Sequence, residues 1–141
     1  MKFRYFINSN WTILEATEVM RALEFAASYY DLTTGISNIK LISNFNDSNV
    51  GDFLRVKSNK FELRFNKTAS VSLKELRLTV FHEMTHVKQS IKDGLRLEGR
   101  NSKFKGINYN SDDMEYWIRP WEIEARGMEG ALEAFYVEDE A

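Results

Sequence analysis

Residues 82–86 read His-Glu-Met-Thr-His, and His82 and His86 are the only histidines in the chain. Residues four apart lie on one face of an α-helix, so both imidazoles can reach one metal ion from adjacent turns. Glu83 can then stand beside the metal and take a proton from a water that zinc acidifies to a pKa of about 7. Two histidines placed at random would fall four apart only about one or two times in a hundred. The spacing therefore indicates a hydrolytic zinc centre with Glu83 as its base.

A catalytic zinc ion needs a third protein ligand, which typically leaves one position for water. The chain has no cysteine and no further histidine, so this ligand must be a carboxylate, and Glu122 and Glu124 follow Pro120. A helical wheel places Glu122 on a charged side that would face solvent, together with Arg126, Glu129 and Glu133. It places Glu124 in line with Met128, Ala131 and Phe135. A carboxylate near an apolar face is costly to bury without a partner, so the wheel favours Glu124 as a ligand.

The segment His-Glu-Met-Thr-His-Val-Lys-Gln, followed by Pro-Trp-Glu-Ile-Glu-Ala-Arg, resembles the gluzincin-type metallopeptidases, particularly very small phage-encoded and bacterial proteins with this pair of motifs. In those proteins the third ligand is the glutamate three residues before the alanine of a Glu-x-x-Ala segment, which implies Glu122. Larger gluzincins place an aspartate four residues after this glutamate to orient a histidine, and here that position is Arg126. The resemblance implies a zincin-like zinc peptidase, and we choose Glu122 over Glu124.

The elements that would position these residues indicate an α+β fold with an N-terminal helix, the histidine-bearing helix, a C-terminal helix and a small antiparallel or mixed sheet. A capping box, Ser or Thr followed three residues later by Glu, opens each of the first two helices. Pro120 suits the first residue of the third. The expected helices run from Thr12 to about Tyr30, from Ser72 to Asp93-Gly94, and from Pro120 to about residue 136.

Period-two alternation predicts strands over residues 2–7, 39–45, 53–57 and 60–66, and an antiparallel meander is the economical arrangement for the last three. In zincins a peptide commonly lies along an edge strand, and Lys60 to Asn66 is the candidate here. Residues 95–115 show no clear period and are expected to form a long irregular loop, which in a compact domain is more often functional than idle. In or near it, Tyr109, Tyr116 and Arg119 are candidates to hold an oxyanion.

The composition limits the class of protein. A chain of 141 residues fits a single domain over residues 1–141, and a hydrophobic content of 43% indicates a globular fold. A net charge of −2 gives no field that would attract nucleic acid or an anionic membrane. The start lacks the apolar run of a signal peptide, and no stretch approaches a membrane span. With no cysteine, we expect a cytoplasmic protein without nucleic-acid or membrane partners.

The two histidines, Glu83 and the candidate carboxylate ligands together predict a zinc-dependent hydrolase that acts on a peptide or protein substrate. One alternative is a non-catalytic module in which zinc fastens the helices of a small domain. Another is a protein-interaction module in which the histidine spacing is accidental. A structural zinc ion has no need of Glu83, so this glutamate favours the enzyme.

Overall fold

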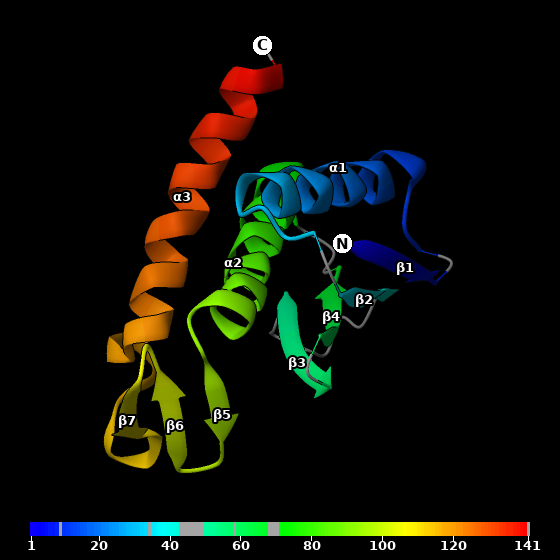
Figure 1. The fold of residues 1–141 in the computed structure, drawn as a ribbon. Coiled ribbons are helices and arrows are strands. Elements are labelled where there is room, and N and C mark those ends of the chain that lie inside the picture. Colours follow the sequence, from blue (N-terminus) through cyan, green and yellow to red (C-terminus); the bar gives the residue numbers. More distant parts are fainter. Residues whose placement is uncertain (9, 34, 43–49, 58, 68–70, 141) are drawn as a thin grey trace.

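The computed structural model of the protein describes residues 1–8, 10–33, 35–42, 50–57, 59–67 and 71–140, except for the side chain of residue 140. Within these residues the chain forms an α+β fold with three α-helices, a four-stranded mixed sheet and a three-stranded antiparallel sheet (Figure 1). The α+β class expected from the sequence is therefore confirmed. The second half of the strand expected over residues 39–45 lies outside the described residues.

The three helices are α1 (Ile13–Tyr29), α2 (Leu73–Lys92) and α3 (Pro120–Glu140). Both expected capping boxes are present, at Thr12 for α1 and at Ser72 for α2, and each satisfies backbone N–H groups at the helix start. α3 starts at the expected proline and continues beyond the expected residue 136. In the part of the chain that the structure describes, none of the helices combines the length and the apolar character needed to cross a bilayer.

The larger sheet contains β1 (Lys2–Ile7), β2 (Ile36–Ile42), β3 (Gly51–Lys57) and β4 (Lys60–Asn66), in the order β1-β2-β4-β3. β1 and β4 both run parallel to β2, and only the β3–β4 hairpin is antiparallel. The expected antiparallel meander is wrong, and β4 is not an edge strand. Phe61, Leu63 and Phe65 of β4 are fully buried, which suits an interior strand, and β3 takes the edge.

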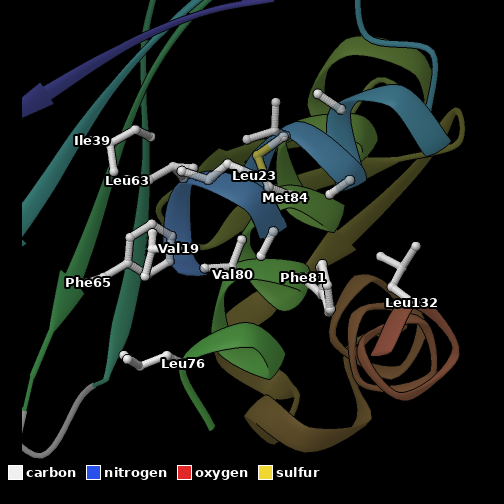
Figure 2. Packing of buried hydrophobic residues seen from close by; sticks show 14 of the residues in the cluster. Val19, Leu23, Ile39, Leu63, Phe65, Leu76, Val80, Phe81, Met84 and Leu132 are labelled. Atoms are coloured by element: carbon white, nitrogen blue, oxygen red, sulfur yellow. The ribbon is translucent and has the colours of Figure 1, made fainter. Parts of the chain in front are cut away.

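The main core lies between this sheet and the helices. α1 and α2 pack against one face of the sheet, and α3 packs against α2 on the side away from it (Figure 2). Leu63 and Phe65 of the sheet lie near the side chains of α1 and α2, whereas Phe81 of α2 lies near Leu132 of α3. Each fully buried side chain of this size contributes about 1.5–3 kcal/mol. α2 is therefore held from two sides, which fixes the orientation of the helix that carries both histidines.

Residues 95–115 do not form the irregular loop expected from the sequence. They contain β5 (Arg96–Glu98), β6 (Asn101–Phe104) and β7 (Ile107–Asn110), paired as an antiparallel sheet below α3 in Figure 1. Gly99, Lys105 and Gly106 adopt positive φ in the two connecting turns, as tight hairpins require. Strands of three or four residues are too short for alternation to reveal them. Short 3₁₀ helices follow at Ser111–Asp113 and Tyr116–Ile118.

Candidate metal centre

α2 carries His82 and His86 on one face, next to the face that enters the core. Val80 and Met84 are fully buried, whereas the His82 side chain keeps partial access to solvent. The capping box at the start of the helix is closed by reciprocal bonds, since Ser72 Oγ accepts from the N–H of Glu75 at 3.1 Å. The packing of the apolar face sets the rotation of α2, which fixes the direction of both imidazoles.

His82, His86 and Glu122 form a three-residue group whose potential ligand atoms all lie within 4.8 Å of one another. Nε2 of His82 lies 3.1 Å from Oε2 of Glu122, and Nε2 of His86 lies 2.9 Å from Oε1. Ligands bonded to one tetrahedral zinc at about 2.0–2.2 Å lie roughly 3.4 Å from each other. The spacing of the three groups therefore fits a shared zinc ion.

The other nitrogen of each ring has its own acceptor. Nδ1 of His82 lies 2.8 Å from Oε2 of Glu129, and Nδ1 of His86 lies 2.8 Å from Oε1 of Gln89. The Gln89 amide nitrogen donates to the carbonyl of Trp121 at 2.9 Å, which leaves its oxygen to face His86. A carboxylate and an amide oxygen only accept, so Nδ1 of each ring carries a proton in these contacts, and a metal would replace the proton that Glu122 favours on Nε2. Nε2 is then the atom that can bind a metal.

The surroundings of the two imidazoles favour a positive charge. Burial opposes a charge on His82, but hydrogen bonds with Glu122 and Glu129 outweigh it and raise its pKa to about 10. The pKa of His86 is raised in the same way, against its burial, by Glu122. Burial would raise the pKa of Glu122, but the two imidazoles hold it well below its usual range. The carboxylates that favour a proton on Nε2 equally favour a metal cation there.

Glu83 lies beside this group without belonging to it. Its side chain is buried, and burial raises its pKa to about 7, although the neighbouring His86 and His82 oppose the shift. Gly51 of β3 approaches it closely: a Cβ at that position would lie 3.5 Å from Oε1 of Glu83 and would overlap Cγ2 of Thr79. The carboxyl group therefore sits between α2 and the first residue of the edge strand.

A cavity of about 880 Å³ opens over these residues. β3 contributes Gly51 and Phe53 to its wall, and the ring of Phe53 lies 5.7 Å from the ring of His86. Aromatic side chains from the 3₁₀ helix Tyr116–Ile118 line another part, with Trp117 exposed over 62% of its surface. The metal group, defined as His82, His86 and Glu122, therefore borders this cavity together with Glu83.

The structure places Glu122, and not Glu124, against the histidines. The Glu124 carboxylate accepts instead from Gln89 at 3.1 Å and from Lys105 at 3.1 Å, and lies 3.4 Å from Lys88 Nζ. The helical wheel failed because the charged side of α3 does not face solvent. Glu122 is 4% exposed and faces the imidazoles of α2. Glu133, further along the same side of α3, is 8% exposed and pairs with the Arg77 guanidinium of α2.

Of the three oxyanion candidates, the structure brings only Tyr116 into the cavity wall among the described residues. Burial raises its pKa, and the carboxylates of Glu122 and Glu83 raise it further. Arg119 lies behind it, with its guanidinium 5.6 Å from the Tyr116 ring, and donates to the carbonyl of Ser111. Tyr109 packs on Trp121 in a small apolar cluster, with ring centroids 5.7 Å apart.

One residue that contacts a proposed metal ligand, Glu129, was not among the sequence candidates. Glu129 contacts His82, and its spacing of seven residues from Glu122, two helical turns on one face, was a usable signal. The wheel had detected this shared face but assigned it to solvent.

The chain matches no protein-family model, no curated protein sequence and no solved structure. The chemistry of the site itself therefore carries the function. The features that bear on the function are the metal group, the buried Glu83 beside it and the cavity that they border.

Proposed function

We propose that the protein is a zincin-like, zinc-dependent peptidase in which His82, His86 and Glu122 hold the metal and Glu83 is the general base. The observation that carries this proposal is the convergence of two Nε2 atoms on one buried carboxylate beside a second, separate carboxyl group. When bound, zinc supplies a Lewis acid that acidifies water and polarises the substrate carbonyl. The chain has no cysteine, which suits work in a reducing compartment such as the cytoplasm.

Glu83 has the properties that general base catalysis requires. Its pKa, raised by burial to about 7, lies near neutral pH, where a base can both accept and return a proton. It accepts one proton from the attacking water as the new C–O bond forms. It then gives that proton to the amide nitrogen as the C–N bond breaks, which releases an amine and a carboxylic acid.

Tyr116 is the group of this chain that we assign to the oxyanion. Its raised pKa keeps the phenol protonated, so its O–H can donate to the oxygen of the tetrahedral intermediate. The side chain lines the cavity, and its hydroxyl hydrogen-bonds with the Glu122 carboxylate, so the donor lies next to the proposed metal ligands. Tyr116 and Glu83 thus carry separate roles, donation to the oxyanion and proton transfer.

β3 offers a backbone edge for an extended peptide. β4 pairs with one side of β3, and residues 50–53 line the cavity. An extended chain can add to such an edge through main-chain hydrogen bonds. Because Gly51 lies against Glu83, this pairing would bring a peptide bond close to the base. The edge replaces the expected one, Lys60–Asn66, which lies inside the sheet.

The non-catalytic zinc module is the weaker alternative. A structural zinc site is closed by four protein ligands, whereas the metal group in the described residues has three and borders a large cavity. A structural site also has no use for a buried carboxyl group such as Glu83. Both features favour the peptidase.

The test combines metal analysis with cleavage of a peptide library by the wild type, Glu83→Gln and the control Glu138→Gln, whose residue is exposed near the end of α3. We expect about one zinc per chain in all three proteins and cleavage by the wild type and the control only. The proposal is refuted if protein that was never exposed to a chelator carries no zinc and binds none on titration. Full activity of Glu83→Gln would refute the assigned base.

A further inference from the structure

The imidazole of His82 is held between two carboxylates of the same helix. Glu122 and Glu129 are seven residues apart in α3, which is about two turns, so their side chains leave the same face. Glu122 Oε2 lies 3.1 Å from Nε2 of His82, and Glu129 Oε2 lies 2.8 Å from Nδ1. α3 therefore contacts both ring nitrogens of a residue on α2.

His82 depends on α3 more than His86 does. The acceptor for Nδ1 of His86 is Gln89, which belongs to α2 itself and is anchored to the Trp121 carbonyl. The His86 side chain is also more enclosed, at 6% exposure against 16% for His82. In the part of the chain that the structure describes, the acceptor for Nδ1 of His82 is Glu129.

We propose that Glu129 is a positioning residue for His82: by accepting the Nδ1 proton it fixes the ring orientation and the tautomer that present Nε2 to the metal. This inference rests on the proposed zinc site. A carboxylate hydrogen-bonded to a metal-binding histidine also raises the basicity of the ligand, and its loss typically weakens metal binding about 10- to 100-fold.

The position of Glu129 differs from the one that the sequence resemblance implies. The residue four after Glu122 is Arg126, whose guanidinium donates to the carbonyl of Trp117 and lies 5.1 Å from the Trp117 ring. Arg126 thus supports the cavity wall at Trp117. The acid that orients the histidine is three residues, or about one turn, further along α3.

The first test measures zinc affinity by competition with a chromophoric chelator for the wild type, Glu129→Ala, Glu129→Gln and the control Glu138→Ala. We expect binding weaker by about 10- to 100-fold for Glu129→Ala. Glutamine keeps an oxygen acceptor without the charge, so Glu129→Gln should lose less zinc affinity than Glu129→Ala. The control should bind zinc as tightly as the wild type. If Glu129→Ala fails to fold by circular dichroism, Glu129→Gln against the control decides the question.

The second test reads the ring itself, by long-range ¹H–¹⁵N correlation spectra of the zinc-loaded proteins. The chain has only two histidines, so His86 serves as an internal reference. We expect the Nδ1–H signal of His82 to be lost to exchange or shifted in Glu129→Ala, while that of His86 stays unchanged. A purely structural role would disturb both rings or neither.

Two outcomes distinguish failure of the positioning role from failure of the proposed zinc site. Zinc affinity of the Glu129 variants within about twofold of the wild type, with an unchanged His82 signal, overturns the positioning role and leaves the zinc site standing. Absence of zinc binding by the wild type overturns the proposed function, and the inference falls with it.

Discussion

Gly51 of β3 lies against the carboxyl group of Glu83 on α2, and a Cβ at residue 51 would stand 3.5 Å from Oε1 of Glu83. This relationship joins the edge strand to the base of the proposed reaction. The same Cβ would overlap Cγ2 of Thr79, which lies one turn before Glu83 on α2. Any side chain at residue 51 must therefore move the strand, Thr79 or the base.

The first prediction is that Gly51→Ala lowers kcat/KM for a peptide substrate about tenfold, which corresponds to about 1.4 kcal/mol, without loss of zinc. The cause is displacement of β3 or Glu83 by the overlap with Thr79. Thr79→Ser removes Cγ2 but keeps the hydroxyl that donates to the Glu75 carbonyl, so the double variant should recover activity. Full activity of Gly51→Ala would show that the contact is unimportant.

The second prediction concerns the third ligand. Glu122→Ala should weaken zinc binding by at least the roughly 100-fold that loss of a supporting residue can cause, because it removes a direct ligand. Glu124→Ala should affect mainly thermal stability, since its carboxylate pairs with Gln89, Lys88 and Lys105. Calorimetric zinc titration of both variants provides the measurement. The opposite ranking would return the ligand role to Glu124.

The third prediction is that Tyr116→Phe lowers kcat by about 10²–10³, with little change in KM or zinc content. Phenylalanine preserves the ring in the cavity wall and removes only the donor to the oxyanion. Steady-state kinetics with a cleavable peptide test this expectation. A change confined to KM would assign Tyr116 to substrate binding.

The fourth prediction concerns the ion pairs that fasten α3 to the other helices. Arg77 of α2 makes a two-bond contact with Glu133 of α3, at 2.6 and 2.9 Å, and donates to Glu18 of α1 at 3.2 Å. Arg77→Met should lower the free energy of unfolding by about 3 kcal/mol, because it leaves the Glu133 carboxylate, which is only 10% exposed, without its charged partner.

Urea denaturation measures this loss, and a matched variant separates charge from packing. Arg77→Met/Glu133→Met removes both partners, so it should be more stable than Arg77→Met alone. Equal stability of the single and double variants would show that the stranded Glu133 carboxylate costs little.

The fifth prediction is a pH dependence at the start of α1. Burial opposes ionisation of Glu15, but hydrogen bonds with Lys67 and with the Thr12 backbone and side chain outweigh it, and the pKa is lowered from 4.5. A lowered folded-state pKa gives stability that is present above the unfolded pKa and is lost as pH falls through the folded one. Glu15→Gln should therefore lower the free energy of unfolding by about 1 kcal/mol at neutral pH and by progressively less in acid.

Chemical denaturation of the wild type and Glu15→Gln across the acid range tests this sign. Glutamine can still cap the helix, so the difference isolates the negative charge of Glu15, which faces Lys67 and the positive end of the α1 dipole. A difference that grows on acidification would contradict the assignment.

Local chemistry made much of this protein predictable. The capping boxes at Thr12 and Ser72 and the proline at residue 120 act within one helical turn, so the helix starts could be predicted from neighbouring residues. The shared face of His82 and His86 follows equally from the geometry of any α-helix. These features depend on the backbone repeat and not on what packs around it.

The tertiary structure decided the features that depend on which surfaces meet. β4 lies inside the sheet because β2 pairs with it in parallel, and alternation within a strand carries no information about its neighbour. Glu122 meets the histidines because the charged side of α3 packs on α2, where imidazoles make its burial favourable. A helical wheel separates charged from apolar faces, but only the packing of two helices determines whether a charged face meets water or a partner.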